Sequence, residues 1–67
     1  MSDIFDVHFD DDVASNSKGI NGTYDECMDY IRQYNGTNES YFEDYKGGIV
    51  SIYNETTGEM VYFEEVR

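Results

Sequence analysis

The stretch TYDECMDYIRQYNG, residues 23–36, carries the signals of an amphipathic helix and of both its ends. Thr23 and Glu26 form a capping box, in which the threonine hydroxyl accepts the Glu26 N–H and the glutamate carboxylate accepts the Thr23 N–H. Gly36 suits the C′ position that ends a helix. Behind the cap, an apolar stripe at spacings of three and four comprises Tyr24, Cys27, Met28, Ile31 and Tyr34. The pattern predicts one helix with a single buried face.

A strand is predicted before this helix, because residues 4–9 alternate between apolar and polar side chains. Its two faces carry Phe5, Val7 and Phe9 on one side and Asp6 and His8 on the other. The acidic run from Asp10 to Asp12 ends the strand. The residues that follow include two glycines and two asparagines, so we predict a flexible surface loop over residues 13–22.

Two further strands are predicted after the helix, over residues 49–53 and 60–66, with NETTG between them. Gly58 can supply the left-handed residue of a bulged hairpin turn. In one register, Val50 and Ile52 face the core beside Val61 and Phe63. The opposite face then carries Ser51, Tyr53, Met60, Tyr62 and Glu64. The other register stays open, and residues 37–47 fit a short strand, a helical turn or an ordered loop.

The order strand, helix, strand, strand predicts an α+β domain of two layers, an antiparallel sheet with one helix packed across one face. With 67 residues the chain has room for one domain, which we expect over residues 1–67 with flexible ends. Hydrophobic residues make up 39% and aromatic residues 16% of the chain, which favours a folded protein despite its charge.

Cysteine content and the N-terminal sequence indicate a cytoplasmic protein. A single Cys27 cannot form an intramolecular disulfide, which fits a reducing compartment. The first six residues have neither the basic region nor the apolar run of a signal peptide, and no segment is apolar enough to span a membrane. Four Asn-x-Ser/Thr triplets are therefore interpreted as turn sequences and not as glycosylation sites.

No catalytic, metal or cofactor motif is evident, and we predict that the protein is not an enzyme. His8 and Cys27 are the only residues of their types, and Cys27 lies on the apolar helix stripe, as a core thiol would. Asp10 to Asp12 could begin a calcium-binding loop, but the positions that an EF-hand requires hold Ala14, Ser15 and Asn21. Gly47 and Gly48 precede a strand and lack the spacing of a phosphate-binding loop.

Acidic side chains occur in or next to every predicted element. Fifteen Asp and Glu residues against four Lys and Arg give a formal net charge of −11, which repels nucleic acids and anionic membranes and attracts basic surfaces. Carboxylates two residues apart on a strand are about 6.8 Å apart, a spacing similar to that of DNA phosphates. The candidate partner-binding acids are Asp6, Asp10, Asp11, Asp12, Asp25, Glu26, Asp29, Glu39, Glu43, Asp44, Glu64 and Glu65.

Aromatic residues offer a second kind of contact, since they are frequent hot spots of protein interfaces. The candidate anchors are Tyr41, Phe42 and Tyr45, together with Tyr53 and Tyr62. The alternative is that these rings fill the core of a chain that contains neither Leu nor Trp. For the acids, the corresponding alternative is a solvated surface that serves solubility alone.

In its size, charge and order of elements, the whole chain resembles small acidic proteins by which phages disable host enzymes. This group includes DNA-mimicking anti-restriction proteins, anti-CRISPR proteins, the inhibitor of uracil-DNA glycosylase and a small acidic inhibitor of bacterial RNA polymerase. The resemblance implies a monomer or homodimer that blocks the nucleic-acid-binding site of a host enzyme in the bacterial cytoplasm. A second hypothesis is an acidic adaptor or inhibitor that binds a basic protein surface outside any nucleic-acid groove.

Overall fold

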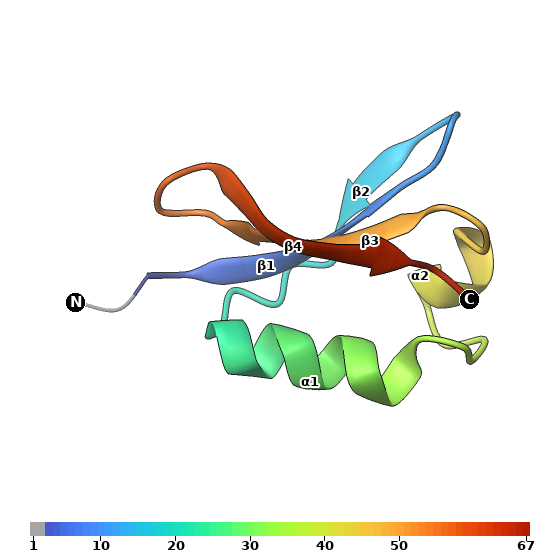
Figure 1. The fold of residues 1–67 in the computed structure, drawn as a ribbon, viewed down its shortest axis with the longest axis horizontal. Coiled ribbons are helices and arrows are strands. Elements are labelled where there is room, and N and C mark those ends of the chain that lie inside the picture. Colours follow the sequence, from blue (N-terminus) through green and yellow to red (C-terminus); the bar gives the residue numbers. More distant parts are fainter. Residues whose placement is uncertain (1–2) are drawn as a thin grey trace.

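A computed structural model describes residues 3–67 and contains one four-stranded antiparallel sheet, in the order β2-β1-β3-β4, with α1 packed across one face (Figure 1). The elements in chain order are β1 (Phe5–Asp10), β2 (Ser15–Ser17), α1 (Tyr24–Tyr34), α2 (Tyr41–Asp44), β3 (Ile49–Asn54) and β4 (Glu59–Glu65). The predicted α+β class and the two layers are confirmed. Met1 and Ser2, part of the N-terminal end predicted to be flexible, lie outside the described residues.

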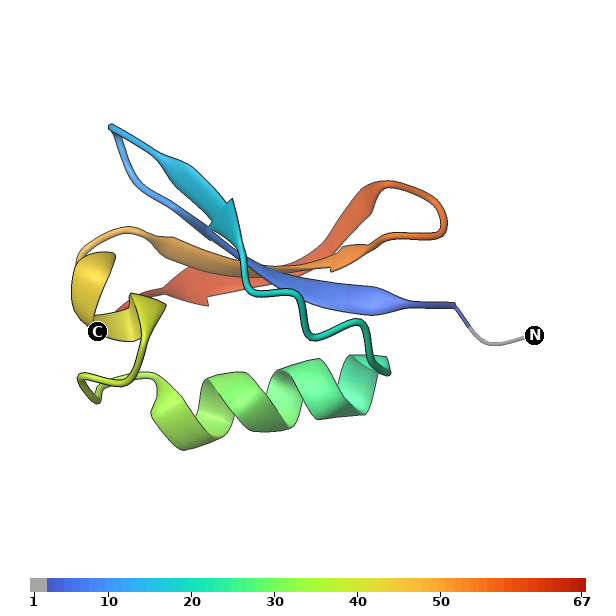
Figure 2. The same cartoon turned by 180° about the vertical axis from the view of Figure 1, so that it is seen from behind.

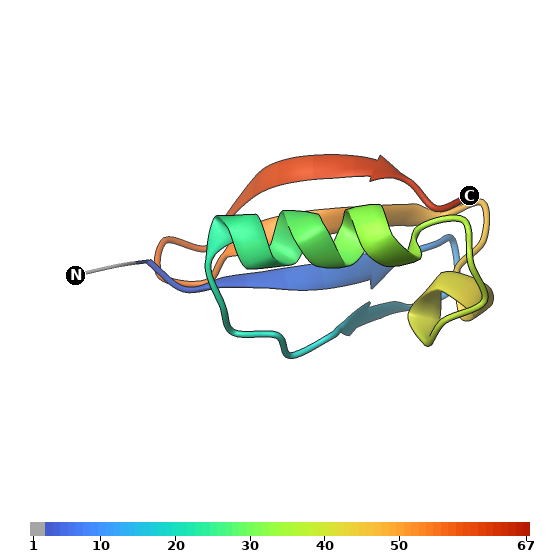
Figure 3. The ribbon, with the colours of Figure 1, turned by 90° about the horizontal axis from the view of Figure 1, so that it is seen from below.

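The predicted capping box starts α1. The Glu26 N–H donates to Thr23 Oγ1 at 3.1 Å, and the Thr23 N–H donates to Glu26 Oε1 at 2.8 Å. At the other end the chain leaves the helix through Gly36, whose φ of +96° favours glycine. Figure 3 shows that α1 runs along β1 and β3, and its Cys27 and Ile31 side chains are fully buried against the sheet. Local sequence signals therefore placed this helix correctly.

Aromatic rings fill one end of the core. Phe9 of β1 lies edge-to-face against Phe42, with ring centroids 4.9 Å apart, and its centroid is 5.7 Å from that of Tyr45. Phe42 and Tyr45 belong to α2 and the residue after it, so the helical turn is the correct choice among the three conformations left open for residues 37–47. Both side chains are buried. They are core residues, as the alternative interpretation of these rings holds, and their burial leaves little of them for contact with a partner.

Residues 13–22 were predicted to be a flexible loop, but they contain the edge strand β2. It pairs antiparallel with β1, with Ser17 opposite His8 and Ser15 opposite Asp10. The Lys18 N–H also donates to the Val7 carbonyl at 2.7 Å. A short edge strand with polar side chains lacks the apolar alternation by which strands are recognised. Its pairing with β1, and not its composition, makes it a strand.

The β3–β4 hairpin adopts the register that buries Val50 and Ile52, but their partners on β4 are Glu64 and Tyr62. A bulge next to Ile52 leaves Val61 as the extra residue, and Phe63 lies opposite Ser51. Val61 and Phe63 therefore do not join Val50 and Ile52 in the core, as one of the two registers left open would require. An offset of one residue transfers every later side chain of a strand to the other face.

The turn between these strands explains the register. Asn54 accepts the backbone N–H groups of Thr56 and Thr57 through Oδ1, at 3.0 and 3.3 Å, and its carbonyl accepts the Gly58 N–H at 2.6 Å. Gly58 has a φ of +80°, as predicted for the left-handed residue. The Asn54 side chain and Gly58 together set the pairing of Asn54 with Glu59, from which the strands proceed.

The capping box predicts the effect of Thr23→Ala. Removing the hydroxyl leaves the Glu26 N–H without its acceptor, so the free energy of unfolding should fall by about 1 kcal/mol. Urea denaturation followed by circular dichroism measures the change. The matched control is Asn38→Ala, an exposed position outside the helices, which should change the stability by less than about 0.5 kcal/mol. Equal stability of both variants would show that the capping box contributes little.

Candidate partner-binding surface

The face of the sheet opposite α1, here called the open face, is lined by side chains of β1, β3 and β4. Because alternate residues of a strand point to opposite faces, the strand pairing places three rows of side chains on the open face, and each row crosses β1, β3 and β4. These rows are Asp10–Ile49–Glu65, His8–Ser51–Phe63 and Asp6–Tyr53–Met60. Figures 1 and 2 show α1 on one side of the sheet, with the β1–β2 tip and the β3–β4 turn rising on the other.

The open face exposes large apolar side chains. Phe63 is 61% and Met60 50% exposed, and Val61 and Ile49 are also exposed beside them on β4 and β3. Within residues 3–67, the remaining large hydrophobic residues with such exposure are Ile4 and Val13. Contiguous exposed apolar residues are typical of interaction surfaces, whereas isolated ones are normal on any protein. The open face is therefore the best candidate for protein contact.

Sequence reasoning missed Phe63 and Ile49 as surface residues. One of the two registers left open places Phe63 in the core, because its spacing from Val61 favours one apolar face of β4. The signal that could have corrected this is the turn, since Asn54 and Gly58 are typical of a turn that defines its own closing pair. Counting outward from that pair, with the bulge that such turns often bring, places Phe63 opposite Ser51.

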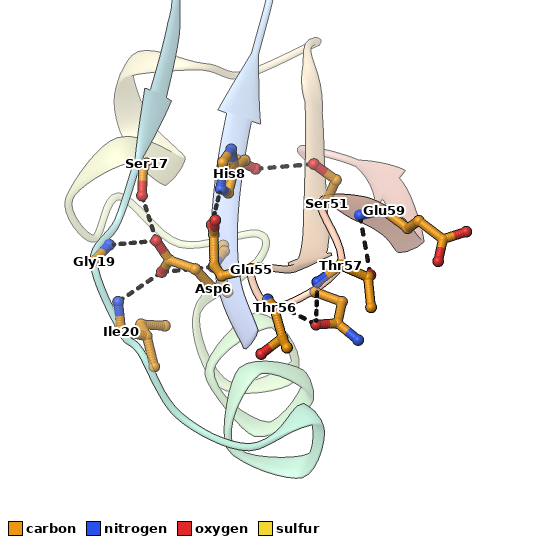
Figure 4. Close-up of polar contacts among 12 residues, drawn as sticks. Asp6, His8, Ser17, Gly19, Ile20, Ser51, Glu55, Thr56, Thr57 and Glu59 are labelled. Atoms are coloured by element: carbon orange, nitrogen blue, oxygen red, sulfur yellow. Dashed lines mark hydrogen bonds and ion pairs between the residues drawn. The ribbon is translucent and has the colours of Figure 1, made fainter. Parts of the chain in front are cut away.

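His8 lies in the middle of the open face and is half-buried. Its ring stacks on Tyr53 with centroids 4.3 Å apart, and its Nε2 is 2.8 Å from Glu55 Oε1 (Figure 4). Tyr53, one of the predicted anchors, is thus held by a neighbour and partly exposed. Tyr62, the candidate anchor on β4, faces α1 and donates its hydroxyl to Glu64.

Asp6 does not lie at the surface, although it was predicted to contact a partner. Its carboxylate is 3% exposed, because the chain from Ser17 to Ile20 folds over it. It accepts the backbone N–H groups of Ile20 at 2.6 Å, Val7 at 2.8 Å and Gly19 at 3.2 Å, and also the Ser17 hydroxyl (Figure 4). A carboxylate with four internal donors is a structural group, so the prediction for Asp6 is wrong.

The hydrogen bonds of Asp6 also set its protonation. Burial by itself raises the pKa of this carboxyl, but the bonds from Ser17, Ile20 and Val7 outweigh burial and lower the pKa below its ordinary value of 3.8. A carboxyl whose pKa is lower in the folded than in the unfolded chain stabilises the fold above the ordinary pKa. That contribution is lost as the pH falls through the folded-state value.

Asp6→Asn should therefore lower the free energy of unfolding by about 2 kcal/mol at neutral pH, since the charge-assisted bonds are lost. Below pH 3.8 the difference between wild type and variant should shrink, because the wild-type carboxyl becomes protonated. Urea denaturation across this pH range measures both effects. Asp12→Asn, at an exposed position, is the control for loss of one negative charge. A difference that does not change with pH would contradict this role.

The other predicted acids are distributed over the surface. Those that are exposed are Asp11, Asp12, Asp25, Glu26, Asp29, Glu39, Glu43, Asp44 and Glu65, while Asp10 and Glu64 are half-buried. Some of them already accept internal hydrogen bonds. Glu26 belongs to the capping box, Asp11 accepts the Val13 and Ala14 N–H groups, and Glu64 accepts the Asn35 side chain. The structure brings them to no single cluster.

Few cations neutralise these acids. Within residues 3–67, the only ion pairs are His8–Glu55 and Arg32–Asp29, both at least partly exposed. Lys18 donates to the Ser40 hydroxyl and lies over the rings of Tyr30 and Tyr41, and Lys46 donates to backbone carbonyls of Thr37 and Arg67. Neither lysine therefore pairs with an Asp or Glu side chain, and most of the negative charge faces the solvent.

A shallow hollow of about 490 Å³ adjoins one end of the open face. It lies between the β1–β2 tip and the segment that enters β3, and it is lined by Asp10, Asp11, Asp12, Val13, Lys46, Gly47, Gly48 and Ile49. Gly48 is required there, because a Cβ atom would be 2.3 Å from the Asp10 carbonyl. The three aspartates outnumber Lys46 among these residues, so the net charge at this end of the face is negative.

Asp6, His8 and Glu55 bring potential metal ligands within 4.8 Å of one another, a grouping that sequence reasoning did not find because Glu55 is distant in the chain. Both oxygens of Asp6 already accept two hydrogen bonds each, and His8 is paired with Glu55. A metal ion would have to displace bonds that hold the chain together. The grouping is better explained as a polar network that supports β1.

The Cys27 thiol is not poised for chemistry. Burial, with smaller contributions from the charges of Asp6 and Glu26, raises its pKa from 9.0 to about 11. At neutral pH the thiol is protonated and is a poor nucleophile. Its position in the core is that predicted from the helix stripe.

Cys27 should react slowly with Ellman's reagent in the folded protein. A pKa of about 11 instead of 9.0 reduces the thiolate fraction about a hundredfold at mildly alkaline pH, and burial slows access further. Absorbance of the released thionitrobenzoate gives the rate with and without denaturing urea. Cys27→Ser provides the blank. Equal rates in both conditions would mean that the thiol is accessible and reactive.

The fold and the surface define a small acidic α+β domain with one open, partly apolar sheet face. Comparison with protein-family models, with curated proteins and with solved structures gave no match to this chain. Within residues 3–67, neither helix has the length or the hydrophobicity to cross a membrane.

Proposed function

We propose that this protein is a non-enzymatic inhibitor that occupies the basic, nucleic-acid-binding site of an enzyme or defence complex in place of DNA or RNA. The observation that carries the proposal is the charge on the surface. Exposed carboxylates occur on α1, on α2 and on β4, while the lysines are engaged with neutral groups. We place the activity in the cytoplasm of a bacterial host, as the resemblance to phage inhibitors implies.

A folded polyanion is well suited to such a site. Proteins that bind DNA gain much of their affinity by neutralising phosphates with Lys and Arg. Carboxylates on helices and strands present negative charge with little further loss of conformational entropy on binding. The long-range field of a chain with a net charge of −11 also accelerates association with a basic groove. The same charge weakens the compact state, so solubility alone is an insufficient reason for it.

A second candidate is an acidic adaptor or inhibitor that binds a basic protein surface outside any nucleic-acid groove. The apolar open face favours it. Phe63 and Met60 add contacts that imitation of phosphates does not require. In this case DNA would not compete for the partner.

Capture from a bacterial lysate with the tagged protein, at moderate salt and with mass spectrometry of the bound proteins, separates the two candidates. For the mimic we expect capture of a nucleic-acid-binding protein, and displacement of it by excess duplex DNA. Capture that DNA leaves unchanged supports the adaptor instead. If no protein is captured above the level of an untagged control, both candidates are wrong.

A variant with four exposed carboxylates replaced by amides tests the role of charge and keeps the hydrogen bonds within the domain. Asp25, Glu39, Glu43 and Asp44 are exposed, and within residues 3–67 none of their carboxylates accepts a hydrogen bond, since Glu39 bonds to Thr37 through its backbone N–H. Changing all four to their amides should weaken capture and reduce its sensitivity to salt, because fewer charges take part. Full capture by this variant would mean that these carboxylates do not contribute.

A further inference from the structure

The open face combines exposed apolar side chains with negative charge, and the one basic side chain in its three rows, His8, is paired with Glu55. Neither β1, β3 nor β4 contains a Lys or Arg residue. Asp10 and Glu65 lie at one end of the face, in the row with Ile49, and Glu55, which follows β3 at the other end, contacts His8 of the middle row. The acidic hollow continues the end at Asp10. The exposed apolar side chains of β3 and β4 are therefore bordered by carboxylates at both ends of the strands.

The exposed Phe63 ring adds little to the stability of the fold. Full burial of a phenylalanine side chain is favourable, yet this ring is 61% exposed in a domain whose core is small. Tyr62 and Glu64 take the inward positions next to it and bond to each other. A chain that carries so much charge gains nothing from an exposed apolar patch unless the patch is covered in a complex.

From this combination we infer that the open face is the contact surface for a basic protein whose apolar projection, surrounded by Lys and Arg, packs on Phe63, Met60 and Ile49. The inference rests on the proposed function, in that the occupant is the same basic partner, and it names the surface that this partner covers. Contacts with these apolar side chains would provide affinity that persists at high salt, and the surrounding carboxylates would favour a basic partner.

Charge complementarity also excludes a second copy of this chain as the occupant. Two open faces in contact would place Glu55, Glu65 and Asp10 of one copy near the carboxylates of the other, with no Lys or Arg from β1, β3 or β4 between them. Like charges brought together in an interface are strongly unfavourable. A basic partner neutralises the same groups.

NMR titration with two designed peptides tests the surface without the natural partner. One peptide alternates arginine with phenylalanine, and the other alternates arginine with serine. We expect the first to bind at least tenfold more tightly and to shift the amide resonances of β3 and β4. Equal affinity for both peptides, or shifts centred on α1, would overturn the inference. A failed lysate capture would contradict the proposed function and leave this measurement unaffected.

Single substitutions identify the side chains that the arginine–phenylalanine peptide contacts. Phe63→Ala and Met60→Ala should each reduce the preference for the arginine–phenylalanine peptide about tenfold or more, whereas Gln33→Ala on the exposed side of α1 should leave it unchanged. Exposed side chains can be shortened without opening a cavity, and circular dichroism checks that the variants are folded. Sedimentation at neutral pH should give a monomer. A dimer that Phe63→Ala dissociates would assign the face to a second copy and overturn the inference.

Discussion

In β1, the buried Asp6 carboxylate accepts hydrogen bonds from Ser17, Gly19 and Ile20, and it thereby holds the segment that leads from β2 to α1 against the sheet. The position of α1 depends on this attachment, because the helix begins only a few residues later at its capping box. Burying one charged group is costly, and here four donors offset the cost. The same donors remove Asp6 from the set of acids that face a partner.

The remaining acids oppose folding more than they assist it. With two ion pairs within residues 3–67 and a net charge of −11, surface electrostatics destabilise the compact state. Stability comes instead from the core, where Phe9, Phe42 and Ile31 are fully buried, and from the local bonds of the capping box and the β3–β4 turn. Apolar and backbone interactions therefore hold the fold together, and most carboxylates remain available to the solvent or to a basic partner.

The open face relates the two functional hypotheses to each other. Charge distributed over the surface favours binding to any basic groove and speeds association. The exposed side chains of Phe63 and Met60 would add shape complementarity and specificity for a particular partner. A protein that imitated only the charge of nucleic acid would not need these exposed side chains. Contact through the open face is compatible with inhibition of a nucleic-acid enzyme, provided that its basic site also offers an apolar projection.

The sequence by itself determined the features that depend on neighbours in the chain. These are the helix with its Thr23–Glu26 cap, the alternation that made β1 a strand, the left-handed Gly58 and the acidic surface. Only the tertiary structure decided the burial of Asp6, the strand character of Ser15–Ser17, the helical turn that buries Phe42 and the outward side of Phe63. Each of these depends on a partner distant in sequence or on a register that one bulged residue shifts, and no local pattern contains that information.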